Sequence, residues 1–121
     1  MKIVSLNLWG GKIKVPLRNF LNKYKEDIDM FCFQEMIHHG TKETMGEKFQ
    51  DMDSSLYSNI SKILTDHRGY FRPEKENNVW GLAIFIRKNI LVKQEGEITI
   101  LETKNYESGE GTKKKSPVYK T

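Results

Sequence analysis

The chain has 121 residues, of which 37% are hydrophobic and 30% are charged. This length predicts one small domain, and this composition excludes both a wholly disordered chain and an integral membrane protein. The formal net charge is +4, and five lysines against three glutamates in residues 102–121 account for half of it. A phosphate-rich partner is therefore permitted but not required, and an ordinary solvated surface is the simpler explanation of the charge.

Cys32 is the only cysteine, so the chain can form no intrachain disulfide and no cysteine-based zinc site. Because it sits in an apolar run, we expect its thiol to behave as a small buried hydrophobe. The apolar stretch at the start of the chain is too short for a signal peptide, and no run is long enough to span a bilayer. We therefore expect a cytoplasmic protein without a membrane span.

The first 35 residues predict a strand, a helix and a second strand. Residues 2–8 alternate in side-chain character, and two glycines end the run. Pro16 suits the first turn of a helix, whose apolar stripe consists of Leu17, Phe20, Leu21 and Tyr24. Residues 28–34 are apolar on both faces, which indicates a strand buried on both sides. Such a strand–helix–strand unit leaves its two strands parallel.

The middle of the chain is less regular. Residues 36–53 are polar and predict a long loop with some helix. Residues 54–65 place apolar side chains at helical spacing, and Asp53 or Ser54 is the expected N-terminal cap. Residues 66–79 predict a polar connection.

The last part of the chain begins with a strongly apolar strand at residues 80–86. Residues 90–92 and 97–101 predict its hairpin partner, with a turn near Gly96. Residues 102–121 are almost free of apolar groups, so we expect a tail without regular structure or core contacts.

Asn7 and Glu35 each stand at the carboxyl end of one predicted parallel strand. In open α/β sheets these ends meet at one edge, where ligands bind, so the two side chains can converge. A carboxylate beside a neutral amide suits a hard cation such as magnesium, and the amide NH₂ can donate to a phosphate oxygen. The alternative is a glutamate that faces water and an asparagine that closes a turn, and spacing alone favours this alternative.

Three segments in order carry a resemblance to a known family. They are residues 2–11 (KIVSLNLWGG), 28–36 (IDMFCFQEM) and 81–88 (GLAIFIRK). The first holds an Asn followed by a bulky residue and Gly, the second ends in Gln-Glu, and the third reads Gly-x-Ala-Ile with a basic residue after it. Over about residues 2–101, the chain resembles the endonuclease/exonuclease/phosphatase family.

The resemblance implies an α/β (α+β) chain that forms part of a four-layer α/β/β/α sandwich, mainly one mixed sheet with helices on its outer face. It implies that residues 1–101 are the N-terminal part of a hydrolase that uses Mg²⁺ or Mn²⁺ to cleave phosphoesters, as nucleases and phosphatases do. In that reaction the metal assists the attack of water on the phosphoester. Glu35 is implied as a catalytic metal ligand, and Asn7 as a residue that holds the metal or the scissile phosphate.

The family's later motifs, an Asn-x-His sequence, an Asp-x-Asn pair and a final Asp-His, have no counterpart in residues 1–121. We therefore expect this chain to be inactive by itself, and to self-associate or to bind a complementing C-terminal half. The expected substrate is a phosphoester, with nucleic acid among the candidates. The rival hypothesis is a non-catalytic α+β interaction module, or an inactive remnant of the family, that packs on a partner.

Four further residues are weaker candidates for substrate binding. Trp9 either lines a pocket beside Asn7 or packs in the core, and core packing is the simpler interpretation. His38 and His39 either border the site or belong to a surface loop. Arg68 lies in a basic and aromatic segment, a mixture found both on nucleic-acid surfaces and at packed strand edges.

Overall fold

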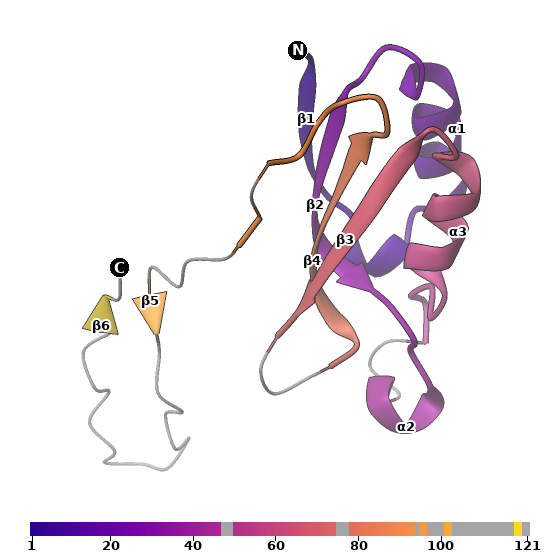
Figure 1. The fold of residues 1–121 in the computed structure, drawn as a ribbon. Coiled ribbons are helices and arrows are strands. Elements are labelled where there is room, and N and C mark those ends of the chain that lie inside the picture. Colours follow the sequence, from indigo (N-terminus) through magenta and orange to yellow (C-terminus); the bar gives the residue numbers. More distant parts are fainter. Residues whose placement is uncertain (47–49, 75–77, 94, 97–100, 103–117, 120–121) are drawn as a thin grey trace. The chain divides into compact units, whose positions relative to one another are not determined.

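The structure is a computed structural model and describes residues 1–46, 50–74, 78–93, 95–96, 101–102 and 118–119. The chain divides into two compact units, Met1–Leu91 and Val92–Thr121 (Figure 1). In the second unit, strand β5 (Leu101–Glu102) pairs antiparallel with β6 (Val118–Tyr119). The expectation of a tail without regular structure therefore fails at β6, and residues 103–117 and 120–121 lie outside the described residues.

The described residues of the first unit form one mixed sheet and its helices. The strands are β1 (Ile3–Asn7), β2 (Met30–Ile37), β3 (His67–Pro73) and β4 (Trp80–Arg87), and the helices are η1 (Trp9–Gly11), α1 (Lys14–Tyr24), α2 (Lys42–Met45) and α3 (Leu56–Ile63). The strand order is β1-β2-β4-β3. Strands β1 and β2 are parallel, and β4 runs antiparallel to β2 and β3. This arrangement confirms the predicted α+β class.

The β1–α1–β2 unit follows the sequence pattern closely. Helix α1 has Pro16 in its first turn, where the missing amide hydrogen is not needed. Its Leu21 is fully buried, and the other members of the predicted stripe pack against the core. The expected parallel pairing of the two strands is confirmed, with Ile3 opposite Met30 and Asn7 opposite Gln34.

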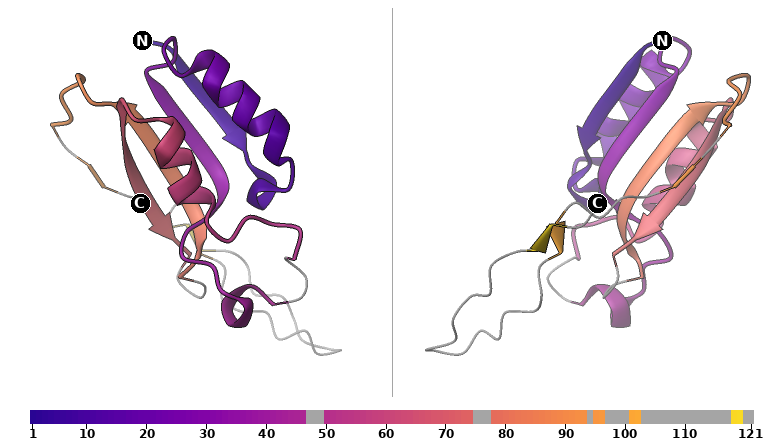
Figure 2. Two further views of the ribbon diagram at one scale, coloured as in Figure 1. Left: turned by 90° about the vertical axis from the view of Figure 1, so that its right-hand side faces the viewer. Right: turned by 60° about the vertical axis from the view of Figure 1, so that its left-hand side comes forward.

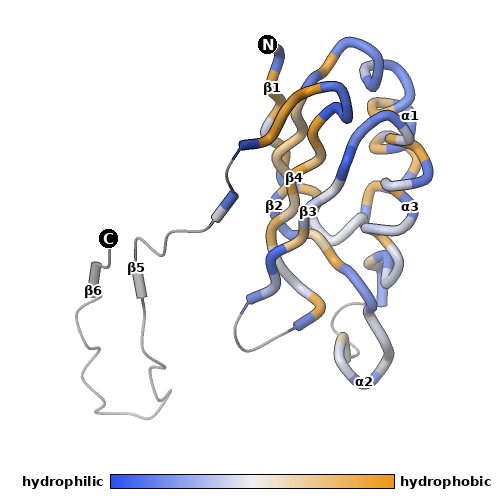
Figure 3. Tube along the Cα trace, in the orientation of Figure 1, coloured by the Kyte–Doolittle hydropathy of each residue, from blue (hydrophilic) through white to orange (hydrophobic). Residues whose placement is uncertain are grey.

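Helices α1 and α3 cover the same face of the sheet (Figure 2). On that face, aromatic side chains of neighbouring strands meet at the centre of the core, where Phe33 lies 5.9 Å from Phe85 between ring centroids. Strand β4 is hydrophobic along most of its length, whereas β3 carries polar stretches at both ends (Figure 3). No described helix covers the other face of the sheet, on which Ile3, Leu82 and Ile84 are exposed.

The prediction of a polar connection at residues 66–79 was wrong, because residues 67–73 form the edge strand β3. Its side chains alternate, so Phe71 packs against the core while Arg68 and Arg72 are exposed. Strand β4 pairs antiparallel with β2 on one side and with β3 on the other, so residues 90–92 are not its hairpin partner. The other half of the expected hairpin falls mostly on residues 97–100, outside the described residues.

The predicted helix at residues 54–65 is confirmed as α3, two residues shorter at each end. The expected cap, Asp53 or Ser54, was wrong, because the N-cap residue is Ser55 and makes no side-chain cap hydrogen bond. The carboxylate of Asp53 instead accepts the backbone N–H of Ser55 at 2.9 Å and the side-chain amide of Asn59 at 2.7 Å. The predicted loop at residues 36–53 contains the short helix α2, and β2 extends into it as far as Ile37.

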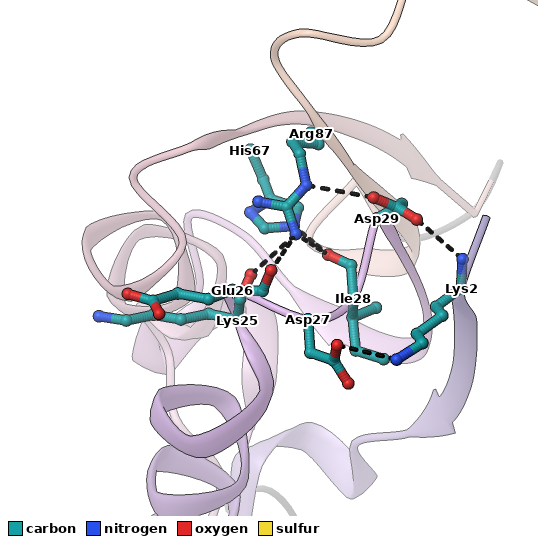
Figure 4. A network of polar contacts seen from close by, with 8 residues as sticks. All are labelled: Lys2, Lys25, Glu26, Asp27, Ile28, Asp29, His67 and Arg87. Atoms are coloured by element: carbon teal, nitrogen blue, oxygen red, sulfur yellow. Dashed lines mark hydrogen bonds and ion pairs between the residues drawn. The ribbon is translucent and has the colours of Figure 1, made fainter.

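Arg87 is the last residue of β4 and lies at the end of the sheet opposite Asn7. Figure 4 shows the polar contacts of its side chain. Its Nη2 donates to the carbonyl oxygens of Glu26 at 2.7 Å and Ile28 at 3.0 Å, and its Nε donates to Asp29 Oδ1 at 3.2 Å. The carbonyl of Ile28 also accepts from Nε2 of the buried His67 at 2.8 Å. Arg87 thus satisfies the backbone of the turn between α1 and β2.

Candidate functional site

The site forms where β1 ends beside β2. Asn7 lies opposite Gln34, and the next amide, that of Leu8, donates to the Gln34 carbonyl at 2.9 Å. Glu35 follows Gln34 directly. Since neighbouring strands lie about 4.8 Å apart, Asn7 and Glu35 stand close together at the same edge of the sheet.

A β-bulge changes the direction of β2 at this point. Phe33 pairs with Ala83 and Met36 with Gly81, so Gln34 and Glu35 together oppose the single residue Leu82. Without the bulge, strict alternation after Phe33 would direct Glu35 into the aromatic core. The bulge moves the carboxylate out of that core and leaves Met36 to fill the next buried position.

Glu35 has an unusual backbone conformation, with φ of 55°. A residue with a side chain adopts this left-handed region at a cost of roughly 1–2 kcal/mol. Its carboxylate, half-buried, has no hydrogen-bond or ion-pair partner among the described residues. Glu35 was expected at the end of the strand, but β2 continues to Ile37. It stands instead where the pairing with β1 ends.

Asn7 closes a turn, as in the simpler of the two interpretations of this residue. Its Oδ1 accepts the backbone N–H of Trp9 at 2.9 Å. The amide oxygen retains a second lone pair, and the NH₂ group has no hydrogen-bond partner among the residues that the structure describes. Asn7 can therefore still donate to a phosphate oxygen while it holds the turn.

Trp9 does not pack in the core, contrary to the simpler expectation. It has φ of 51° and is 53% exposed. The Nζ atom of Lys12 lies 4.8 Å from the centroid of its ring. The turn made by Asn7 directs this side chain outward, a consequence that hydrophobic patterning does not reveal.

The loop after β1 is fixed to the start of α3. Gly10 and Gly11 have φ of 61° and 79°, which only glycine adopts without strain. The carbonyl of Gly10 accepts the N–H of Asp53 at 2.8 Å, and a Cβ on Gly11 would lie 3.0 Å from both Asp53 and Leu56. These close approaches hold the loop beside Asn7 in one position.

His38 and His39 follow the end of β2, at the same edge of the sheet. Their rings stack with centroids 3.7 Å apart, and His38 also contacts Tyr57 at 4.3 Å and Phe71 at 5.4 Å. Nδ1 of His38 is buried without a hydrogen-bond partner. Burial, and then the charge of His39, lower the pKa of His38 from its ordinary value of 6.5. His38 is thus held by aromatic contacts, while His39 is exposed.

Arg68 lies at the far end of the sheet and does not join this group, since it pairs with Ile86, which pairs with Met30. The arginine level with the site is Arg72, which pairs with Leu82 opposite the bulge. Sequence reasoning missed it because both arginines occur in one short segment, and only the strand register separates them.

A groove of about 350 Å³ lies between α1 and α3. Leu17, Leu21, Leu56 and Ile60 are among its lining residues, and Asn7 and Glu35 are not. This groove is therefore distinct from the candidate site.

The side chains of Asn7 and Glu35 determine which cation can bind at this edge of the sheet. Glu35 is a single carboxylate beside a neutral amide, and the described residues contain no group of three or more His, Cys, Asp or Glu side chains able to bind a metal. A dehydrated structural ion does not fit such a set. A magnesium ion that keeps several of its waters does, because it binds proteins through one or two carboxylates.

No protein-family model, no curated protein and no solved structure matches the chain. None of the helices in the described residues is long and apolar enough to cross a membrane.

Proposed function

We propose that the edge formed by Asn7 and Glu35 binds a hydrated Mg²⁺ or Mn²⁺ ion, and that the chain belongs to the metal-dependent phosphoester hydrolases. The observation that carries the proposal is the carboxylate of Glu35, which has no partner among the described residues and is held in a strained bulge next to Asn7. Strain of this kind persists where the surrounding structure maintains it, often at functional sites. The resemblance of residues 2–11, 28–36 and 81–88 to the endonuclease/exonuclease/phosphatase family supports the same class.

Each residue has a distinct task in this proposal. Glu35 holds the cation, and the NH₂ group of Asn7 donates to an oxygen of the phosphoester. Arg72 adds positive charge at the same level of the sheet. The cation, when bound, polarises the phosphoryl oxygen and stabilises the charge that develops there. Nucleases and phosphatases share this chemistry, so the proposal names the reaction class and not one substrate.

Turnover by this chain alone is expected to be negligible. A water molecule must be oriented for attack, and positioning contributes several orders of magnitude to such rates. In the part of the chain that the structure describes, no aspartate is hydrogen-bonded to a histidine to perform this task. The proposed activity therefore needs further groups, from self-association or from a complementing C-terminal half.

Metal titration by calorimetry tests the proposal. We expect weak binding of Mg²⁺ and Mn²⁺ that Glu35→Gln abolishes and that Asp66→Asn, which removes an exposed carboxylate at the opposite end of the sheet, leaves unchanged. Asn7→Asp should tighten binding by about tenfold, because it adds a charged ligand and keeps the acceptor for Trp9. Equal affinities in the wild type and in Glu35→Gln would reject the site.

A non-catalytic interaction module is the second candidate, and the sheet face without a helix favours it. Ile3, Leu82 and Ile84 are exposed there, and exposed apolar side chains that form a patch of several hundred Å² mark an interaction surface. Under this alternative the chain binds a partner through that face and does not bind divalent cations at Glu35. The same titration separates the two candidates.

A further inference from the structure

The connection between β1 and α1, together with the first turn of α1, exposes large apolar side chains close to basic ones. Trp9 is 53% exposed, Ile13 51% and Val15 53%. We define these three residues as the apolar loop. They fall within seven consecutive residues, between the end of β1 and the first turn of α1. One short segment of the chain therefore carries three apolar side chains that are not in the core.

Positive charge predominates in the segment that carries the apolar loop. Residues 9–18 contain Lys12, Lys14 and Arg18 and no acidic residue. One acidic residue, Asp53, lies next to this segment, because its N–H donates to the carbonyl of Gly10. Its carboxylate accepts hydrogen bonds from Ser55 and Asn59, and three cations outnumber it. A negatively charged partner is therefore favoured at this surface.

We propose that the apolar loop docks on a membrane surface that contains anionic lipids. Tryptophan is enriched at the boundary between acyl chains and headgroups, and lysine can bury its methylene stem while its ammonium group reaches the headgroups. Lys12, whose Nζ lies above the ring of Trp9, already has this arrangement of an apolar body and a polar tip. Binding of this kind combines apolar burial with attraction to anionic lipids.

The aliphatic members of the loop favour a lipid over a nucleic acid. A single strand binds by stacking its bases on aromatic rings in a positively charged groove. Trp9 could stack in this way, but Ile13 and Val15 offer no flat face for a base. All three side chains gain by transfer into the acyl region. Nucleic-acid binding is accordingly the competing outcome of the test.

The position of the loop links docking to the candidate site. Asn7 Oδ1 holds the backbone of Trp9 at 2.9 Å, so a membrane bound at Trp9 would bring lipid phosphate groups near the edge that carries Asn7 and Glu35. The docking inference itself does not depend on the proposed hydrolase function, because it rests on exposure and charge alone.

Co-sedimentation of the full chain with vesicles, in EDTA, tests docking without any contribution from divalent cations. We expect binding to vesicles of mixed phosphatidylcholine and phosphatidylserine, and weak binding to phosphatidylcholine alone. The triple variant Trp9→Ala, Ile13→Ser, Val15→Ser should bind at least about tenfold less tightly. Lys12→Gln with Lys14→Gln should weaken binding by roughly twenty-fivefold, about fivefold for each lysine.

The matched control is Leu91→Ser, which removes a side chain that is 79% exposed and should leave vesicle binding unchanged. A second measurement follows tryptophan emission in a Trp80→Phe background, where a shift to shorter wavelength on adding mixed vesicles reports entry of Trp9. Absence of vesicle binding, equal binding by the triple variant, or preference for a single-stranded oligonucleotide at the same ionic strength would overturn the inference. Failure of the Glu35 metal titration would leave it intact.

Discussion

At the scale of single residues, the strained backbone of Glu35 is the feature that most needs a physical reason. The bulge has two effects, since it removes the carboxylate from the aromatic core and leaves it at the sheet edge without a partner among the described residues. Both effects favour a ligand-binding role over a stabilising one.

Substitution of Glu35 by glycine and by alanine tests whether the strain is real. In an ordinary strand, alanine is more stable than glycine. At φ of 55° the order should invert, so that Glu35→Gly exceeds Glu35→Ala in free energy of unfolding by about 1 kcal/mol. Urea denaturation followed by circular dichroism measures the difference. If the alanine variant proved the more stable of the two, the left-handed conformation of Glu35 would be refuted.

His38 predicts how stability depends on pH. Its pKa is lower in the folded chain than the ordinary 6.5, first because of burial and then because of His39. Between these two values the unfolded chain binds more protons, so stability is complete above about pH 6.5 and is lost as the pH falls through the folded pKa.

The variant His38→Phe should therefore flatten the loss of stability between pH 7 and pH 5 in urea denaturation. It keeps the ring contacts with Tyr57 and Phe71 and removes the buried nitrogen that lacks a partner. His39→Asn serves as the control, because asparagine tolerates the φ of 59° at this position. It should retain most of the pH dependence, since burial is the larger cause. Identical pH profiles for the wild type and His38→Phe would contradict this account.

At the scale of the elements, Arg87 joins β4 to the turn between α1 and β2. Arg87→Met should lower the free energy of unfolding by about 2 kcal/mol, because the part-buried carbonyl of Ile28 and the exposed carbonyl of Glu26 lose a charged donor. Arg87→Lys should recover only part of the loss, since one ammonium group cannot reproduce the fork of the guanidinium. Denaturant melts measure both, with Lys88→Met as the control. Equal stability of Arg87→Met and the wild type would exclude this role.

Asp29, the ionic partner of Arg87, adds a second loss of stability with falling pH, in a more acidic range than that of His38. The backbone N–H of Lys2 and the side chain of Arg87 lower the pKa of Asp29 below its ordinary 3.8. The stability that this carboxylate contributes is present above pH 3.8 and disappears as the pH falls through the pKa of Asp29 in the folded chain. It therefore belongs to acid unfolding and can be separated from the effect of His38.

The elements that sequence could predict are those set by local pattern. Alternation in β1, the apolar stripe of α1 and the position of Pro16 required no knowledge of distant residues. Strand β3 was missed because an edge strand keeps polar residues such as Arg68 and Arg72 on its open side. Its identity follows from pairing with β4, which a single sequence does not display.

In the candidate site, too, local pattern predicts some features, and strand register and hydrogen bonding determine the others. Asn7 and Glu35 were predicted from their place after two apolar strands, and the parallel pairing on which that prediction rested is confirmed. The bulge at Glu35 depends on the count of residues opposite Leu82, and the exposure of Trp9 depends on a turn made by Asn7. Both are consequences of register and hydrogen bonding, so patterning could not predict them.

At the scale of the whole molecule, we expect the sheet face without a described helix to govern self-association. The exposed side chains of Ile3, Leu82 and Ile84 alternate with the core-facing residues of β1 and β4. Sedimentation velocity should therefore show a sedimentation coefficient that increases with protein concentration.

The double variant Leu82→Lys, Ile84→Thr should reduce this association, because it places charge and a hydroxyl group on the open face while keeping a β-branched residue in β4. Leu91→Ser is again the control for the loss of an exposed apolar side chain. A wild-type chain that stays monomeric at all concentrations would show that this face does not drive association.

The most direct test of the central claim is the location of bound Mn²⁺ on the folded chain. The ion broadens nearby backbone amide resonances, so a titration of isotope-labelled protein maps its position. We expect the strongest broadening at residues 7–9 and 34–36, with none there in Glu35→Gln. Broadening centred on the carboxylates of Asp27 and Asp29 at the opposite end of the sheet, or a map unchanged in Glu35→Gln, would contradict the assignment of the metal site to Asn7 and Glu35.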